Sequence, residues 1–350
     1  MTLRIAILSM KEIEKKGQGI PRYIEELYKN LKKLEKKEDI IVKRIYFPHI
    51  RFLGDALSFE LGSIFHPIED SFDIIHIPSG FFIIHRLPKN AKIISTIHDI
   101  NPIPPKIKNL TDLLKDRLWR YILLKRGILW NLKFSSMVVV NSSQTKEEII
   151  NLNANKIDIA IVNLGIDKRF LTSINTNKVK SNEFKVGYIG SFGTNKNLDF
   201  ILQAAKLLKD SIFYLWGAKN YEYRALVENA MALKNVKFMG FAPEDKLVDI
   251  YDSFNVFVFP SYYEGFGIPI IEAQSRGLPV IIYKKGKIPK EVRKYCFEAE
   301  SPEHMSQIIE NLKENGYNET LQKKATEYAR SFTWKRCARE TLEVYKSVYR

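Results

Sequence analysis

The chain has 350 residues, of which 45% are hydrophobic and 12% aromatic. This composition excludes a disordered chain, and the length predicts two domains. The formal net charge is +15, which favours phosphate-bearing ligands, anionic membranes or nucleic acid, although a Lys-rich soluble surface explains it equally well. Only two cysteines occur, Cys296 and Cys337. They argue against a disulfide framework and favour a reducing, cytoplasmic compartment.

Strand and helix patterns alternate through the first half of the chain. The apolar run 3–10 predicts a buried parallel strand, and a helix begins near Pro21. The further strands are predicted at 40–47, 73–77, 92–97, 137–141 and 159–163. This alternation predicts βαβ units and a parallel sheet in a first domain that spans residues 1–168.

The alternation restarts after the polar, aperiodic stretch 169–183, which we interpret as a linker. A second doubly wound domain is predicted over residues 184–331. Its strands are expected at 185–190, 212–216, 236–239, 255–260 and 278–283, and its helices at 198–209, 221–233, from Pro243, and at 269–276, 302–313 and 319–330. The remaining residues, 332–350, predict a last helix.

A loop rich in glycine joins the strand 255–260 to the helix 269–276. Glu264 lies within this loop, and Glu272 lies within the helix that follows. The carboxyl ends of parallel strands are where ligands bind, and a helix N-terminus favours phosphate. The two carboxylates suit hydroxyl groups, so the loop predicts a ligand that carries both, such as a nucleotide sugar. Either glutamate alone would be explained by a turn cap or by the helix dipole.

This stretch resembles the retaining glycosyltransferases of family 4, whose signature is two glutamates separated by seven residues with Gly-Phe-Gly between them. The resemblance implies the GT-B fold, in which two Rossmann-like, doubly wound α/β domains face each other across a cleft. It also implies that Glu264 lies near the donor sugar and that Glu272 holds the ribose. The residues predicted to line the donor site between them are Gly265, Phe266, Gly267 and Ile268.

A second resemblance to the family covers residues 187–198, at the first strand and loop of the donor domain. It implies that Lys196 binds the donor diphosphate, with Ser191 and Asn197 beside it. An ammonium group there can neutralise the leaving group. Many relatives carry an arginine where Ser191 or Asn195 stands, so a second cation is missing. Lys284 and Lys285 are the candidates to replace it.

The first domain carries further family features. His98-Asp99 follows the strand 92–97 and resembles the family's His-Asp pair, which implies that His98 contacts the donor sugar. Gly17 and Gly19 resemble the N-terminal glycine loop, which approaches the donor phosphates or the acceptor. Residues 332–350 resemble the last helix, which in this fold crosses back onto the first domain.

The resemblance implies a hexosyltransferase that moves a mannose- or glucose-type sugar from a nucleoside-diphosphate sugar. The acceptor would be a hydroxyl of a glycan or a lipid-linked molecule. Retention by front-face attack, with no metal ion or other cofactor, is the expected mechanism. The alternatives are a nucleotide-sugar epimerase of the same fold and a basic nucleic-acid-associated protein, although the sequence holds no nucleic-acid-binding motif.

The segment 106–134 mixes lysine and arginine with tryptophan and leucine. Such a basic helix can lie on the inner face of an anionic membrane, which would suit a lipid-linked acceptor. An amphipathic helix packed on the sheet explains the same pattern, and both interpretations stay open. We found no signal peptide and no spanning segment, and we therefore expect a cytoplasmic protein, with peripheral membrane contact as one option.

Overall fold

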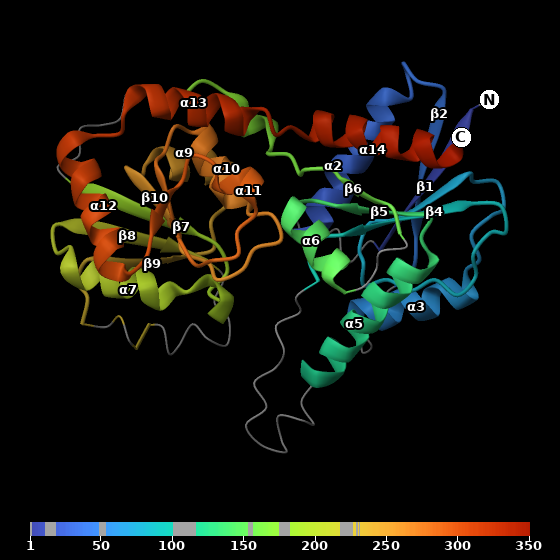
Figure 1. Cartoon of the computed structure of the whole chain (residues 1–350), viewed down its shortest axis with the longest axis horizontal. Coiled ribbons are helices and arrows are strands. Elements are labelled where there is room, and N and C mark those ends of the chain that lie inside the picture. The colour runs from blue at the N-terminus through green and yellow to red at the C-terminus, as the bar shows by residue number, and fades with distance from the viewer. Residues whose placement is uncertain are drawn as a thin grey trace. The chain divides into compact units, whose positions relative to one another are not determined.

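The chain forms two compact units, each built on a parallel sheet with helices packed against it (Figure 1). Unit 1 comprises Met1–Gly165 and Trp334–Arg350, and unit 2 comprises Ile166–Thr333. The structure, a computed structural model, describes residues 2–10, 19–48, 54–100, 117–152, 157–174, 183–217, 227–228, 230 and 232–350. The predicted α/β architecture of two Rossmann-like halves is confirmed.

Within the described residues, the sheet of unit 1 has six parallel strands in the order β2-β1-β3-β4-β5-β6. The strands are β1 (Leu3–Ser9), β2 (Ile40–Tyr46), β3 (Ile74–Ile77), β4 (Lys92–Ile97), β5 (Met137–Val140) and β6 (Ile159–Ile161). After β2 the chain returns to the other side of β1. The order of the strands therefore reverses between β1 and β3, and such a reversal is where open α/β sheets bind ligands.

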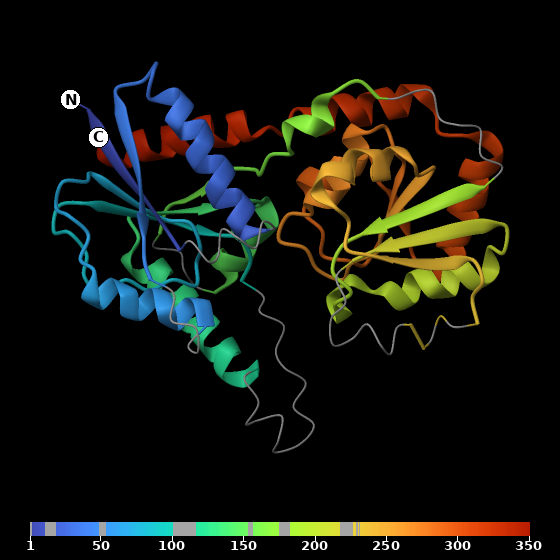
Figure 2. The ribbon, with the colours of Figure 1, turned by 180° about the vertical axis from the view of Figure 1, so that it is seen from behind.

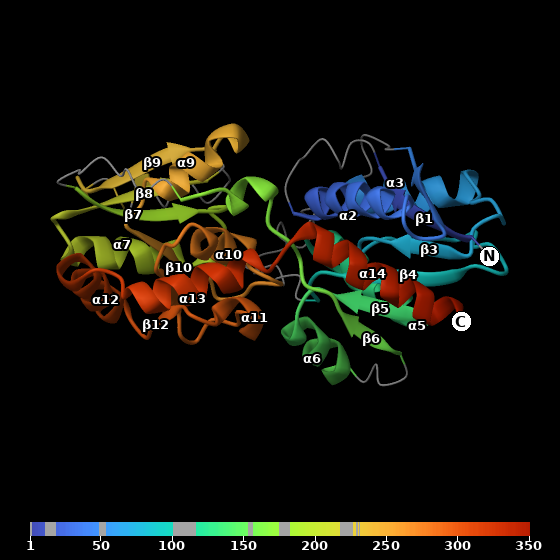
Figure 3. The same ribbon diagram turned by 90° about the horizontal axis from the view of Figure 1, so that it is seen from above.

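The helices of unit 1 come from both ends of the chain. They are α2 (Ile20–Leu34), α3 (Gly54–Phe65), α5 (Arg117–Phe134), α6 (Ser143–Asn151) and α14 (Trp334–Tyr349). Pro21 lies in the first turn of α2, as predicted, and the apolar side of this helix is buried. The last helix, α14, packs against α2 (Figure 3). The helix α3 was not predicted from the sequence.

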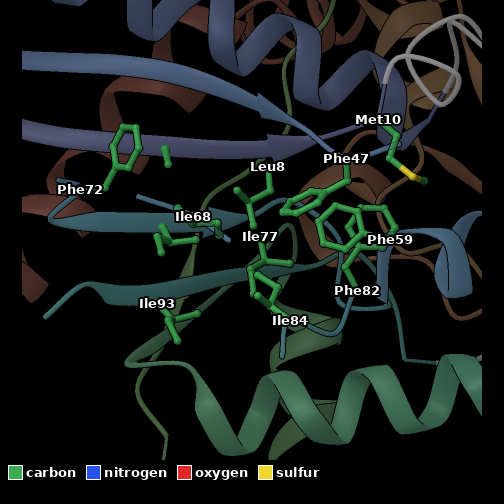
Figure 4. Close-up of a cluster of buried hydrophobic side chains, with 12 residues drawn as sticks. Leu8, Met10, Phe47, Phe59, Ile68, Phe72, Ile77, Phe82, Ile84 and Ile93 are labelled. Carbon is green, nitrogen blue, oxygen red and sulfur yellow. The ribbon is translucent and has the colours of Figure 1, made fainter. Parts of the chain in front are cut away.

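A cluster of buried apolar side chains joins α3 to the sheet of unit 1 (Figure 4). The ring of Phe59 stacks on the ring of Phe82 with 4.0 Å between centroids, and the Phe47 ring lies 4.7 Å from Phe59. Burying each such side chain contributes about 1.5–3 kcal/mol. These contacts explain why α3 forms in a stretch whose own pattern did not predict it.

The described part of unit 2 also forms a sheet of six parallel strands, in the order β12-β11-β10-β7-β8-β9. Figure 2 shows β7, β8 and β9 side by side in yellow-green to yellow. The strands are β7 (Phe184–Ile189), β8 (Ser211–Trp216), β9 (Val236–Gly240), β10 (Val256–Phe259), β11 (Val280–Tyr283) and β12 (Phe297–Ala299). The order reverses between β7 and β10.

Most helices of unit 2 agree with the sequence analysis. They are α7 (Leu198–Leu207), α9 (Leu247–Asp252), α10 (Ile268–Ser275), α11 (Lys290–Arg293), α12 (Pro302–Asn315) and α13 (Glu319–Arg330), with short 3-10 helices η1 (Lys168–Leu171), η2 (Thr194–Lys196) and η3 (Glu244–Lys246). The predicted helix 221–233 falls largely outside the described residues. The short elements α11 and β12 were not predicted.

The first residues of the stretch interpreted as a linker are part of unit 2. Phe170, in η1, is fully buried. The buried guanidinium of Arg276 donates hydrogen bonds to the carbonyl oxygens of Thr172 (2.9 Å) and Ser173 (3.1 Å) and pairs with Asp252 at 2.6 Å. Residues 175–182 lie outside the described part of the chain. The polar composition of this segment suggested a linker. Its partner, Arg276, lies about a hundred residues later in the chain, so no local pattern revealed the contact.

Candidate functional site

The two loops that carry the predicted donor-site residues leave neighbouring strands of unit 2. One follows β7 and contains η2, which ends at Lys196. The other follows β10 and carries Glu264. Because β7 and β10 are the pair between which the strand order reverses, both loops lie at the carboxyl edge where ligand sites form in open α/β sheets.

Lys196 and Glu264 form an ion pair at this edge. The distance from Lys196 Nζ to Glu264 Oε1 is 2.6 Å, and the two side chains are only 15% and 11% exposed. Lys196 Nζ also lies 5.2 Å from the centroid of the Phe259 ring. Partial burial strengthens the attraction between the charges and restricts both side chains. The structure thus brings together two of the residues predicted as catalytic, 68 positions apart.

Main-chain hydrogen bonds fix the backbone on which Glu264 stands. The Tyr262 N–H donates to the Asn195 carbonyl at 2.8 Å, which ties the loop after β10 to the loop after β7. The Glu264 N–H donates to the Lys287 carbonyl at 2.9 Å. In return the Lys287 N–H donates to the Tyr262 carbonyl at 2.8 Å. The carboxylate of Glu264 therefore projects from a braced loop, as a positioned chemical group requires.

The helix α10 begins immediately after this loop. Gly267 caps it with φ +96°, a left-handed conformation in which a side chain would be strained. Pro269 follows in the first turn, where its missing N–H costs nothing. Gly265 and Ile268 are partly buried beside the cap. The positive end of the α10 dipole thus lies next to Glu264, which favours a bound anion there.

Two other motif residues point into the interior of unit 2. Phe266 is 3% exposed, and its ring packs against Phe332 with 5.9 Å between centroids. Glu272 is 4% exposed, and its Oε2 accepts a hydrogen bond from the Tyr251 hydroxyl at 3.0 Å. Tyr251 was not predicted from the sequence, because no local signal connects α9 to a helix about twenty residues later.

The remaining donor-site candidates of unit 2 lie around η2. Ser191 is exposed, and its carbonyl accepts a hydrogen bond from Tyr188 at 2.6 Å. Burial, assisted by the charge of Glu264, raises the pKa of Tyr188 and keeps its hydroxyl a donor. Asn197 has a left-handed φ of 54° where η2 meets α7. Its buried Nδ2 has no hydrogen-bond partner within the described residues.

The lysines considered as a second diphosphate cation lie after β11. Lys284 is exposed and forms an ion pair with Glu300. Lys285 is also exposed. Their replacement of the family's second cation stays a prediction.

His98 lies in unit 1, just after β4. Its Nε2 is 3.1 Å from the Pro78 carbonyl oxygen, and the Tyr23 ring meets its ring edge-on with 4.7 Å between centroids. Burial lowers the pKa of His98 to about 4, so the imidazole is neutral near pH 7. Because a carbonyl only accepts, Nε2 carries the hydrogen and Nδ1 offers a lone pair. His98 can therefore accept a hydrogen bond from a hydroxyl group.

The glycine loop before α2 is only partly within the described residues. Gly19 caps α2 with φ +64°, and its carbonyl accepts a hydrogen bond from the Tyr23 N–H at 3.1 Å. Gly17 falls outside the described part of the chain. Tyr23, which contacts His98, was not singled out by the sequence analysis, although its place on the buried side of α2 follows from the helical period.

The described residues include neither a metal-binding cluster nor a membrane-spanning helix. Among these residues, no group of three or more His, Cys, Asp or Glu side chains is arranged to hold a metal ion. The helices within the described ranges are all too short or too polar to cross a membrane.

Two family models match the chain, one for each half. The model described as Glycosyltransferase Family 4 matches residues 18–170, and the model described as Glycosyl transferases group 1 matches residues 171–332. The chain belongs to the family 4 glycosyltransferases. The resemblance inferred from Glu264 and Glu272 is therefore confirmed, and with it glycosyltransferase as the class of enzyme.

Similar proteins agree with this family. The O-antigen chain mannosyltransferase B of Escherichia coli is 26% identical over 300 residues, which cover 80% of this chain and 76% of that protein. The solved sucrose-phosphate synthase of Thermosynechococcus elongatus has a TM-score of 0.78 at 16% identity, over 99% of both chains. The Anabaena HepE protein, solved with UDP and glucose, has a TM-score of 0.69 at 18% identity, over 99% and 100% of the two chains. The fold of this family 4 chain is GT-B.

Proposed function

We propose that this glycosyltransferase moves a mannose- or glucose-type hexose from a nucleoside-diphosphate sugar to a hydroxyl of a glycan or lipid-linked acceptor, with retention of configuration. The observation that carries the proposal is the Lys196–Glu264 pair at the strand-order reversal of unit 2. In this pair, the Lys196 ammonium group can bind a diphosphate, and the Glu264 carboxylate beside it can accept hydrogen bonds from sugar hydroxyls. The adjoining N-terminus of α10 favours the same phosphates.

The donor diphosphate replaces Glu264 as the partner of Lys196. Charge then builds on the leaving phosphate as the bond to the sugar breaks, and the ammonium group and the α10 dipole stabilise it. Glu264, released from the lysine, accepts hydrogen bonds from the sugar and favours the positive charge that develops on its ring. The leaving phosphate takes the acceptor proton as the acceptor attacks from the same face, so configuration is retained.

His98 contributes a neutral acceptor to the donor sugar. Its Nε2–H is held by the Pro78 carbonyl, so Nδ1 is the atom left to receive a sugar hydroxyl. Lys196 and the α10 dipole supply the positive charge that a metal ion provides in other transferases, and transfer is expected to proceed in EDTA. Loss of transfer in EDTA that Mg²⁺ restores would contradict this part of the proposal.

The donor is identified by a thermal-shift panel of uridine-, guanosine- and adenosine-diphosphate sugars. The similarity to an O-antigen mannosyltransferase supports mannose, and the fold shared with a protein solved with UDP and glucose keeps glucose in the panel. One nucleotide sugar should raise the melting temperature well above the others. Proton NMR of the product made from that donor should show the donor's anomeric configuration. A flat panel would count against the proposal.

We also assign the helix α5 to a peripheral contact with an anionic membrane on the cytoplasmic side. Exposed apolar side chains at Ile122, Leu129 and Phe134 stand beside the exposed bases Lys125 and Lys133. Such a surface binds headgroups and apolar chains together, and it would bring the enzyme to a lipid-linked acceptor. The protein should sediment with phosphatidylglycerol vesicles, and Leu129→Glu should weaken this binding. Equal sedimentation with neutral vesicles would contradict the assignment.

No observation favours the alternatives raised by the sequence. An epimerase would convert the donor's sugar in the absence of an acceptor, and product analysis distinguishes this outcome from transfer. A nucleic-acid-associated protein would bind DNA in a salt-dependent way without any response to nucleotide sugars.

A further inference from the structure

A chain of buried polar side chains runs through the middle of unit 1. His76 lies on β3 between isoleucines and is fully buried. Its Nε2 is 2.8 Å from the Thr96 hydroxyl, and its Nδ1 is 2.6 Å from the hydroxyl of Tyr345 on α14. Each ring nitrogen of His76 thus has a hydroxyl partner. The chain joins the central strands to a helix that follows 269 residues later.

The same chain continues to Tyr23 on α2. The Thr96 hydroxyl is 2.9 Å from the hydroxyl of Tyr23, and both residues are buried. The ring of Tyr23 then meets His98 edge-on, with 4.7 Å between centroids and 80° between planes. Thr96 lies in β4, one position before the strand ends at Ile97, and His98 follows directly after the strand. The hydrogen-bonded chain therefore ends against the predicted catalytic imidazole.

Two contacts on different sides fix the orientation of His98. The Pro78 carbonyl holds Nε2, and the Tyr23 ring packs against the imidazole. Tyr23 cannot tilt without moving its hydroxyl away from Thr96, and Thr96 is held by His76 and so by Tyr345. The Tyr23 ring therefore connects the hydrogen-bonded chain to His98.

A purely structural role does not require this chemistry. Apolar residues at these positions would fill the same space, whereas a buried polar side chain is costly unless its hydrogen bonds are made. Made in full, such a chain is rigid and selects one arrangement of its members. The His98 imidazole requires such a rigid support if it is to accept a hydrogen bond from a sugar hydroxyl.

We infer that Tyr23, Thr96, His76 and Tyr345 form a positioning network that orients His98, so that the last helix of the chain takes part in transfer through His98. The inference rests on the proposed function for the role of His98. It assigns no contact with the substrate to the four residues.

Tyr345→Phe tests the inference by removing one hydroxyl while it keeps the ring. The His98 imidazole signals in a long-range ¹H–¹⁵N spectrum, assigned with His98→Ala, should shift. The kcat should fall by about 10- to 100-fold with little change in the KM for the donor. The matched control is Thr341→Val in the same helix, since the buried Thr341 hydroxyl donates to the Cys337 carbonyl. It should leave both readouts at their wild-type values.

A double-mutant cycle separates positioning from a general loss of structure. Adding Tyr345→Phe or Thr96→Val to His98→Ala should lower kcat no further. An equal loss of kcat with and without His98 would overturn the inference, and so would unmoved His98 signals in Tyr345→Phe. If His98→Ala transferred sugar at the wild-type rate, His98 would have no role in the proposed function. The inferred effect of the network on transfer would then be wrong as well. Nucleotide binding at Lys196 would then still be judged separately.

Discussion

The residues predicted to contact the donor lie in two regions, and different interactions hold each region in place. In unit 2, Lys196 and Glu264 are opposite charges that face each other at 2.6 Å from two braced loops. In unit 1, His98 is a neutral group supported by an uncharged chain of hydroxyls and one neutral histidine. One region is built on charge and the other on hydrogen-bond geometry.

This difference matches the chemistry of a nucleotide sugar. The diphosphate is negatively charged, and its negative charge increases as the bond to the sugar breaks. The residues near it must therefore supply positive charge. Its hexose is neutral, and a neutral imidazole that can only accept through Nδ1 discriminates hydroxyl positions without attracting other anions. Substitutions should therefore act through charge in unit 2 and through orientation in unit 1.

The largest effect is expected from Glu264→Gln, which keeps the shape of the side chain and removes its charge. Transfer should fall by about 100- to 1000-fold in kcat, since one preorganised electrostatic group is lost. The fold should survive, because the loop backbone is held by its own hydrogen bonds. A steady-state transfer assay, with circular dichroism as the check on folding, measures this. Near wild-type turnover would remove Glu264 from the mechanism.

The next effect concerns the stability of unit 1 at mildly acidic pH. Burial lowers the pKa of His76 to about 3 and that of His98 to about 4. The unfolded chain protonates these residues near pH 6.5 while the folded chain does not, so stability is full above that pH and falls below it. Between pH 7 and pH 5 each histidine should lower the free energy of unfolding by about 2 kcal/mol.

Comparison with His76→Gln isolates the contribution of His76. The variant should be less stable at pH 7 because its buried hydrogen bonds are disturbed, but its stability should fall less steeply toward pH 5. Urea unfolding at pH 7 and at pH 5 gives the change in the free energy of unfolding with pH, which is compared between the wild type and the variant. Parallel slopes would show that His76 is protonated in the folded protein, which contradicts a neutral network.

The smallest effect is expected from Glu300→Gln. Glu300 pairs with Lys284 as Glu264 pairs with Lys196, but both side chains of the Glu300–Lys284 pair are exposed. Solvent screens such a pair, so transfer and melting temperature should stay at their wild-type values. Tighter nucleotide binding would instead place Lys284 at the diphosphate as a second cation, because loss of the Glu300 charge frees its ammonium group for the phosphates.

The sequence predicted the features that depend on local pattern. Buried strands, the position of Pro21 at the start of α2 and the loop before α10 follow from periodicity, proline geometry and glycine content. Residues joined by tertiary hydrogen bonds were missed, because their partners are remote in sequence. Tyr345 meets His76, and Arg276 binds the Thr172 carbonyl, through contacts that no window of sequence contains.

The helix α3 shows the same limit at the level of an element. Its sequence gave no clear helical signal, and the stacking of Phe59 on Phe82 supplies the stabilisation. The predicted roles of Lys196 and Glu264 came from the family resemblance. Their pairing came from the strand order, in which β7 and β10 are neighbours although β8 and β9 lie between them in the chain.

Nucleoside-diphosphate binding by Lys196→Ala, measured by isothermal titration calorimetry beside the control Lys209→Ala, tests the central claim most directly. The account predicts that Lys196→Ala weakens binding of the diphosphate of the preferred nucleoside by about 10- to 100-fold, as loss of a charge-assisted contact implies. Lys209→Ala and the wild type should bind alike, because Lys209 is exposed between α7 and β8, at the edge of the sheet opposite the predicted donor site. Unchanged affinity in Lys196→Ala would contradict the claim that the donor diphosphate binds at the Lys196–Glu264 pair.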